Sequence, residues 1–377
     1  MVNIVIAGGG TGGHVFPMVA VGDACKALCA GVRVTYVGTA KGLEAKVIPE
    51  RGDALELLDI RPLRGNGLKG FVKGVYFAAT SIPKARALLK ELDAHTVLSV
   101  GGYAAGPVAL AARTLGLPIA MLEPNSIMGF SNRLLSPFCA RAYTAFPEVD
   151  SKLGAGRVLR AGVPLRGAFS PMPYGLSQGR LRILILGGSL GAKALNESLP
   201  HALLEALPTL EKHHISLQVT HQCGREREEA TKALYNELGL AKYTKVMPFI
   251  QDMAEALSAA DLVVGRAGAS SLAEICVVGR PALLIPYPFA ADDHQMKNAR
   301  SLEKAGAAIA LSQNEATPSR LSAQIQELAL DFDRMRKMAE ACAKLGKADA
   351  AKTIAADLIK LAEGAPQCAQ AAAKEAH

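Results

Sequence analysis

The stretch NIVIAGGGTGGH, residues 3–14, reads as a short run of β-branched apolar residues, a glycine-rich turn and the start of a helix. The same order returns in ILILGGSLGAKALN, residues 183–196. In both halves of the chain, further apolar runs then alternate with helical stretches. Such alternation is typical of parallel sheets covered by helices on both faces. The sequence therefore predicts the α/β class, with two Rossmann-like domains.

A Pro- and Gly-rich stretch, GVPLRGAFSPMPYGLSQG (residues 162–179), interrupts this alternation and places the domain boundary near Val163 to Ser170. We therefore predict one domain over residues 1–162, a second over 163–345, and a C-terminal helix and tail over 346–377. Open parallel sheets bind ligands beyond the carboxyl ends of their strands. The substrate site is accordingly expected in the cleft between the two domains.

Composition narrows the possible partners. The chain has 377 residues, half of them hydrophobic, which suits a globular protein with a large core. Its net charge of +8 suits a nucleic acid, an acidic lipid surface or a phosphorylated substrate. No Trp occurs and aromatics are only 5%, so a base-stacking surface is not expected. Seven Cys without a CxxC pair, and no run of about 18 apolar residues, favour a soluble or peripheral protein in a reducing, cytoplasmic compartment.

The glycine loop Gly8–His14 has the composition of a cradle for a phosphate or a sugar. Glycines let a ligand approach the backbone, and the start of the following helix offers unpaired amide donors. Gly8, Gly10 and Gly13 have the GxGxxG spacing, but the loop is not the dinucleotide fingerprint in its simple form. The next predicted strand, VRVTYVGTAKG (residues 32–42), offers no acidic residue, so NAD and FAD are disfavoured. The alternative is a turn that is glycine-rich only for tight packing.

Two later turns have the same position between a strand and a helix. In Gly187–Lys193, Ser189 could donate its hydroxyl to a phosphate. In GRAGASSLAEI, residues 265–275, Ala269–Ser271 would begin a helix, and Glu274 could reach a diol such as the ribose hydroxyls. The alternative for Glu274 is a capping box with Ser271.

His14 directly follows the first glycine loop, where the helix dipole disfavours a protonated imidazole. A neutral imidazole can act as a general base, whereas a lone histidine is more often structural. Asp292, Asp293 and His294 fit a helix cap better than a metal site, because no further carboxylates are spaced to complete a metal shell. We expect neither a metal nor a cofactor.

Between Arg61 and Lys90 the chain carries seven basic and no acidic residues, interleaved with apolar ones. Such a mixture attracts anionic lipid headgroups and can insert apolar side chains into the membrane interface. The alternative is the solvated face of an ordinary helix over Phe71–Leu89.

Six motifs, taken together, carry a resemblance to a known family. In chain order they are GGGTGGHVFP (8–17), SVGGYAAGPVALAA (99–112), LEPNSIMGFSNR (122–133), GGSLGAKALN (187–196), GRAGASSLAEI (265–275) and PYPFAADDHQMKNA (286–299). They resemble the MurG family over nearly the whole chain. The resemblance implies a two-domain GT-B glycosyltransferase that inverts configuration without a metal. It also implies conversion of lipid I to lipid II for peptidoglycan synthesis, at the cytoplasmic face of the inner membrane.

The implied partners are UDP-N-acetylglucosamine, undecaprenyl-linked lipid I and an anionic membrane surface, with other cell-wall synthesis proteins as further candidates and no nucleic acid. The N-terminal domain would take the acceptor and meet the membrane, and the second domain would bind the donor.

Matching positions carry the family's site residues onto this chain. Near the N-acetylglucosamine these are Thr11, Gly12, Gly13 and Asn125, and near the diphosphate Ser189. The rest of the donor would be held by Arg166, Ile250 at the uracil, Ala269, Ser270, Ser271, Leu272, Ala273, Glu274 at the ribose and Gln295 at the sugar. Many members read His-Glu-Gln-Asn where this chain has Leu122–Asn125, which leaves His14 and Glu123 as candidates for the general base.

Two other function classes fit the same architecture. A UDP-N-acetylglucosamine 2-epimerase needs no lipid, and the basic, apolar stretch from Arg61 to Lys90 argues against it. A non-enzymatic binding protein would hold the nucleotide sugar without turning it over.

Overall fold

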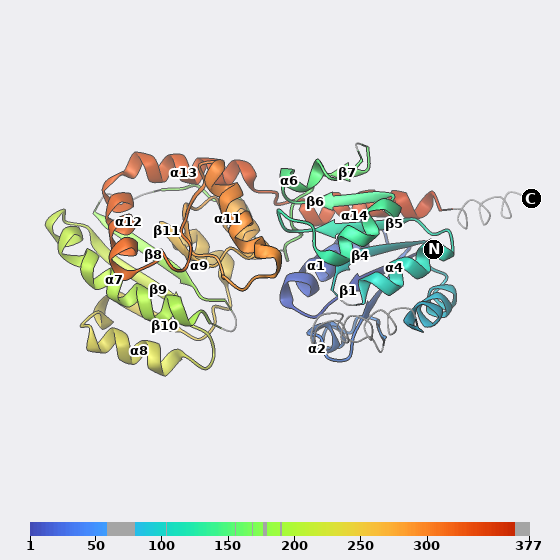
Figure 1. Cartoon of the computed structure of the whole chain (residues 1–377), viewed down its shortest axis with the longest axis horizontal. Coiled ribbons are helices and arrows are strands. Elements are labelled where there is room, and N and C mark those ends of the chain that lie inside the picture. Colours follow the sequence, from blue (N-terminus) through green and yellow to red (C-terminus); the bar gives the residue numbers. More distant parts are fainter. Residues whose placement is uncertain are drawn as a thin grey trace, which may run out of the picture. The chain divides into compact units, whose positions relative to one another are not determined.

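The computed structural model describes residues 1–58, 80–102, 104–154, 156–167, 169–175, 179–188 and 191–365. The chain divides into two compact units (Figure 1). The first unit contains Met1–Gly167 together with the C-terminal segment from Asp349, and the second contains Ala168–Ala348. The predicted α/β class with two Rossmann-like parts is confirmed. The predicted domain limits, 1–162, 163–345 and 346–377, stay predictions.

The first unit is built on a parallel sheet. Its described strands follow the order β3-β2-β1-β4-β5-β6-β7, and neighbouring strands pair in parallel. The order reverses direction between β1 and β4, which is where doubly wound sheets place their ligands. The strands are β1 (Val2–Gly8), β2 (Val32–Gly38), β3 (Leu55–Leu57), β4 (Thr96–Gly101), β5 (Ile119–Glu123), β6 (Arg141–Thr144) and β7 (Val158–Leu159).

Helices cover both faces of this sheet. Alternate residues of a strand point to opposite faces, so each strand contributes side chains to both cores. Ile4 and Ile6 of β1 pack with α1 (Gly12–Leu28) and α14 (Ala350–Glu363). Val5 and Ala7 pack on the other face, where the helical residues 80–91, α4 and α5 lie. The shorter elements are α2 (Glu44–Glu50), α4 (Ala105–Thr114), α5 (Phe130–Leu135), η1 (Ser136–Phe138) and α6 (Pro147–Asp150).

The C-terminal helix α14 belongs to the first unit. In Figure 1 this red helix lies among the blue and green elements of that unit. Asp357 accepts hydrogen bonds from Arg141 Nε at 2.8 Å and from the Tyr143 hydroxyl at 3.0 Å. Ile354 and Leu358 are fully buried in the same core as β1. Helix α14, the last helix of the described residues, therefore completes the core to which β1 belongs.

The second unit repeats the architecture. Its described strands follow the parallel order β10-β9-β8-β11-β12-β13. They are β8 (Arg180–Leu186), β9 (Ser216–Gln222), β10 (Thr244–Met247), β11 (Leu262–Gly265), β12 (Ala282–Leu284) and β13 (Ala308–Ala310). The helices are α7 (Lys193–Lys212), α8 (Glu228–Glu237), η2 (Ala241–Tyr243), α9 (Met253–Ala259), α10 (Ala269–Val278), η3 (Ala291–Asp293), α11 (His294–Lys304), α12 (Pro318–Leu330) and α13 (Phe332–Leu345).

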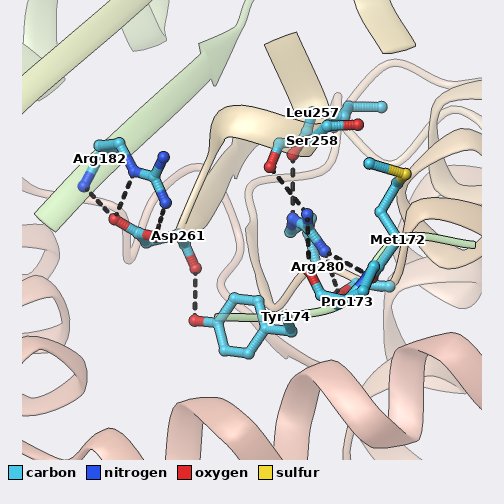
Figure 2. A network of polar contacts seen from close by, with 9 residues as sticks. Met172, Pro173, Tyr174, Arg182, Leu257, Ser258, Asp261 and Arg280 are labelled. Atoms are coloured by element: carbon cyan, nitrogen blue, oxygen red, sulfur yellow. Dashed lines mark hydrogen bonds and ion pairs between the residues drawn. The ribbon is translucent and has the colours of Figure 1, made fainter. Parts of the chain in front are cut away.

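A buried arginine ties the start of the second unit to α9 and to the end of α10 (Figure 2). Arg280 is 3% exposed, and its guanidinium donates to backbone carbonyls. These carbonyls belong to Met172, Pro173, Leu257, Ser258, Val278 and Gly279. Beside it the Tyr174 hydroxyl donates to the carbonyl of Asp261 at 2.8 Å, and the Asp261 carboxylate pairs with Arg182. Residues 172–174 are therefore fixed to the second unit.

The expected membrane stretch from Arg61 to Lys90 lies partly outside the described residues, which omit 59–79. Residues 80–91 are helical, with Ala85 and Leu89 buried and with Lys84 and Lys90 exposed. Within the part of the chain that the structure describes, no helix is long and apolar enough to cross a membrane.

Candidate active site

The first glycine loop joins β1 to α1. Gly9 and Gly10 have φ values of 135° and 95°, which L side chains rarely adopt. The helix begins at Gly12, and the amide of His14 donates to the carbonyl of Thr11 at 3.0 Å. Thr11 and Gly13 are exposed. The loop thus presents the predicted residues Thr11, Gly12 and Gly13 at the carboxyl end of β1.

A carboxylate from α2 fills the inner side of this loop. Glu44 is fully buried, and its Oε2 accepts a hydrogen bond from the amide of Gly10 at 2.7 Å. Its Oε1 accepts from the amide of Thr39 at 2.9 Å and from the Thr39 hydroxyl at 3.1 Å. The Glu44 carboxylate therefore accepts a hydrogen bond from one of the backbone amides that were predicted to bind a phosphate or a sugar. Sequence reasoning missed Glu44, although it lies only two residues beyond the stretch 32–42 that was searched for an acidic residue.

His14 lies against the end of β4. A Cβ added at Gly101 would lie 3.1 Å from His14 Nε2, and one added at Gly102 would lie 2.5 Å from the carbonyl oxygen of Gly9. Both glycines also have positive φ values. The turn after β4 therefore packs closely on the first glycine loop and on its half-buried histidine.

Glu123, the other candidate base, ends β5 and is 2% exposed. Its Oε1 accepts from the amide and side chain of Asn125, and its Oε2 accepts from the amide of Gly129 at 2.7 Å and from Asn132 Nδ2 at 3.0 Å. Burial raises the pKa of this carboxyl, and the hydrogen bonds only partly oppose the effect. The carboxylate orders the loop that carries Asn125.

Arg166 lies over a ring of the first unit. Its guanidinium carbon is 4.0 Å from the ring centroid of Phe16 in α1, a cation–π geometry. The predicted donor contact thus stands beside the helix that follows the first glycine loop.

In the second unit, the second glycine loop follows β8. Ser189, its predicted phosphate ligand, lies outside the described residues. The amide of Gly187 donates to the carbonyl of Gln222 at 3.0 Å, and that of Gly191 donates to the carbonyl of Gly188 at 3.1 Å. A Cβ at Gly191 would lie 2.1 Å from the carbonyl oxygen of Cys223. These glycines allow the loop to pack on the end of β9.

A neutral network anchors the helix that follows this loop. Asn196 Nδ2 donates to the carbonyl of Cys223 at 2.9 Å, so its Oδ1 faces His221 Nε2 at 3.1 Å as an acceptor. His221 Nε2 must then carry the proton, and Nδ1 accepts from the Tyr235 hydroxyl at 2.9 Å. Burial lowers the pKa of His221 to about 4. The sequence did not single out these residues.

The helix α10 begins at Ala269, as predicted, at the end of β11. Its N-cap is Gly268, so the alternative in which Ser271 caps the helix with Glu274 is wrong. Among the described residues, the buried hydroxyl oxygen of Ser270 has no hydrogen-bond partner. Leu272 is buried, while Ser271, Ala273 and Glu274 are partly exposed. The first turn of α10 therefore offers backbone amides and two hydroxyls, and the carboxylate of Glu274 lies farther along the same helix.

Ile250 and Gln295 complete the predicted donor residues. Ile250 is 6% exposed and follows β10. Gln295 Oε1 accepts from the amide of Tyr287 at 3.0 Å, which fixes the loop after β12. Arg266 donates to the carbonyl of Ile285 at 2.9 Å, which ties the ends of β11 and β12 together.

Asp293 does not cap α11 as predicted. Asp293 stands at the N-cap position but makes no side-chain capping hydrogen bond, and both Asp292 and Asp293 have positive φ values. No group of three or more potential metal-ligating residues is present in the described part of the chain.

The structure thus places the predicted residues in two clusters. The first cluster lies at strand ends of the first sheet and contains Thr11–His14, Glu123 and Asn125. The second cluster follows strands of the second sheet and contains Ile250, Ala269–Glu274 and Gln295. Within each parallel sheet the carboxyl ends of the strands meet at one edge. The expectation of a cleft between the two units stays a prediction.

Comparison with known proteins agrees with this division. Residues 4–144 match the glycosyltransferase family 28 N-terminal domain, and residues 182–354 match the family 28 C-terminal domain. The chain is 56% identical, over 96% of its length and 89% of the relative's, to a protein of Sorangium cellulosum. That relative is named UDP-N-acetylglucosamine:N-acetylmuramyl-(pentapeptide) pyrophosphoryl-undecaprenol N-acetylglucosamine transferase.

The chain belongs to the MurG family. The crystal structure of MurG from Acinetobacter baumannii matches with a TM-score of 0.80 and 34% identity, over 96% of this chain and 99% of that one. The chain is therefore a glycosyltransferase with the GT-B fold. A 2-epimerase of Listeria monocytogenes matches with a TM-score of 0.67, 95% coverage of both chains and 14% identity, so it shares only the fold with this MurG family member.

Proposed function

We propose that this chain transfers N-acetylglucosamine from UDP-N-acetylglucosamine to the 4-hydroxyl of the N-acetylmuramyl sugar of lipid I. The product would be lipid II, the precursor of peptidoglycan. The observation that carries the proposal is the 56% identity, over 96% of the chain, to a relative with that named activity. Both site clusters fall within this span.

On the donor side, the first turn of α10 supports the proposal. A helix N-terminus binds anions through its unpaired amides and its dipole, and the Ser270 hydroxyl has no partner among the described residues. Farther along the same helix, Glu274 would bind the ribose hydroxyls of the donor. The N-cap at Gly268 excludes the alternative in which Glu274 forms a capping box with Ser271.

On the acceptor side, His14 is the better candidate for the general base. Both oxygens of Glu123 already accept hydrogen bonds from the chain, and the residue is 2% exposed. The acceptor 4-hydroxyl would lose its proton to the His14 imidazole as its oxygen attacks the anomeric carbon. The bond from that carbon to the diphosphate oxygen breaks, and UDP leaves from the opposite face with the electron pair. The configuration is thereby inverted to a β-linkage.

Charge develops on the leaving diphosphate in this step. We propose that the amides of the second glycine loop and of α10, with Ser189, stabilise that charge in place of a metal ion. Activity should then persist in excess EDTA.

We also propose that the chain works as a peripheral protein at the cytoplasmic face of the inner membrane. Exposed Lys84 and Lys90 on helical residues 80–91 support the predicted attraction to anionic lipid. Binding to anionic vesicles should fall as salt rises, and replacement of Lys69, Lys73 and Lys84 with Gln should weaken it.

One assay separates the three candidate functions. The protein is incubated with UDP-N-acetylglucosamine, with and without a lipid I analogue, in the presence and absence of EDTA. Formation of disaccharide and UDP only with the acceptor supports the proposal. Epimerised nucleotide sugar without acceptor would favour the epimerase, and binding without turnover would favour a binding protein. If EDTA abolishes the activity and Mg²⁺ restores it, only the proposed metal independence is contradicted, and the proposed transfer reaction stands.

A further inference from the structure

The first glycine loop is wrapped around a buried negative charge. Three glycines leave room for Glu44: a Cβ at Gly9 would lie 2.2 Å from its carboxyl carbon, one at Gly38 would lie 2.3 Å from Cγ, and one at Gly42 would lie 2.1 Å from Oε2. These glycines come from the first loop, the end of β2 and the approach to α2. Three separate segments are thus shaped to hold one carboxylate.

The carboxylate is bound as an anionic ligand would be. It accepts three hydrogen bonds, two of them from backbone amides, and the 2.7 Å bond from Gly10 is in the short range of charge-assisted bonds. A second contact closes the arrangement, because the amide of Leu43 donates back to the carbonyl of Gly10 at 3.3 Å. Gly10 is therefore held through both of its backbone groups by residues 43 and 44.

We propose that Glu44 is a positioning residue for the transfer reaction. Its carboxylate occupies the place that a phosphate takes in other glycine loops, and it fixes the loop that leads through Thr11 to His14. This inference rests on the proposed function and on His14 as base.

The primary test compares Glu44→Gln with Glu50→Gln, a matched change at an exposed carboxylate on the same helix. The glutamine side chain has the size of glutamate, but its NH₂ group replaces one carboxylate oxygen. That group would face the backbone N–H of Gly10 or Thr39, which needs an acceptor. We expect kcat with a lipid I analogue to fall at least tenfold, with the affinity for UDP, which lacks the sugar assigned to Thr11–Gly13, unchanged within twofold by calorimetry. Glu50→Gln should behave as wild type. A folded Glu44→Gln protein with kcat within twofold of wild type overturns the proposal, as does an equal loss of affinity for UDP.

A chemical rescue separates positioning from stability. In Glu44→Ala, formate should raise kcat in a saturable way, since it can restore a carboxylate beside Gly10 and Thr39, whereas chloride at equal ionic strength should not. If neither Glu44 variant folds, Thr39→Val carries the test, because it removes one hydrogen bond to Oε1 and keeps both backbone bonds. Its kcat should fall about threefold, and an unchanged kcat would overturn the proposal.

A wild-type protein without transferase activity would instead refute the proposed function, so the two failures are distinguishable.

Discussion

The two glycine loops follow the first strand of each sheet, and they are held in different ways. In the first unit, the amide of Gly10 donates to the buried carboxylate of Glu44. In the second unit, Gly187 donates to a backbone carbonyl, and the following helix is anchored by the neutral pair Asn196 and His221. The same sequence pattern of strand, glycines and helix therefore supports two electrostatic environments. A glycine loop alone does not reveal whether its place for an anion is open or already filled.

This difference suggests a division of labour. A loop whose amide is bound by a carboxylate of the chain is ordered by the protein itself, whereas a neutral anchor leaves the positive end of a helix available to a diphosphate. The following predictions test that division, beginning with the largest effect.

His14→Ala should remove the base from the first loop. We expect kcat with a lipid I analogue to fall roughly a hundredfold to ten-thousandfold, the usual range for general-base catalysis, with donor affinity little changed. His14→Gln should be nearly as slow, because its amide cannot take a proton. Steady-state kinetics and calorimetry measure the two effects, with the exposed His213→Ala as control. Near wild-type activity in His14→Gln would assign His14 to positioning and return Glu123 to the role of base.

Acid should weaken the anchor of the second loop. Above pH 6.5 the His221 imidazole is neutral in both states, but below it the unfolded chain binds a proton that the folded chain excludes down to about pH 4. Stability is therefore lost as pH falls through this window, by about 3 kcal/mol in total. Urea titrations between pH 7 and pH 4 on wild type and His221→Gln measure the effect. Equal pH dependence in the two proteins would show that His221 does not titrate as inferred.

Glu274→Ala should weaken donor binding in the second unit only. Loss of a charged hydrogen bond to the ribose diol is worth roughly 1.5 to 3 kcal/mol, which corresponds to a tenfold to hundredfold rise in the donor Kd. Calorimetry with UDP provides the measurement, and Glu237→Ala, an exposed change in α8, provides the control. An unchanged Kd in a folded protein would remove Glu274 from the donor site.

Ser270→Ala should have the smallest effect. Because the hydroxyl has no partner among the described residues, its removal should leave the free energy of unfolding unchanged. If it binds the donor, its loss should raise the donor Kd about two- to tenfold, the net worth of one neutral hydrogen bond. Reduced stability with unchanged affinity would point to an internal role instead.

Much of this architecture is readable from local pattern. The runs at residues 3–8 and 183–186 predict β1 and β8, and the start of α10 at Ala269 was predicted from the turn before it. The sequence does not single out the short strands β3, β6, β7, β10 and β13, because two to four residues carry no clear periodicity. The capping hypotheses for Ser271 and for Asp293 were wrong, since a cap depends on where the backbone turns and not only on residue type.

The sequence by itself determined the α/β class, the two repeated units, the glycine loops and the family, because strand period, turn residues and motif spacing are properties of short segments. Only the tertiary structure decided that Glu44 fills the first loop, that α14 returns to the first unit and that His221 is held neutral. Each of these facts depends on contacts between segments distant in the chain. Such contacts arise from packing and from the need of buried polar groups for partners, which no local pattern records.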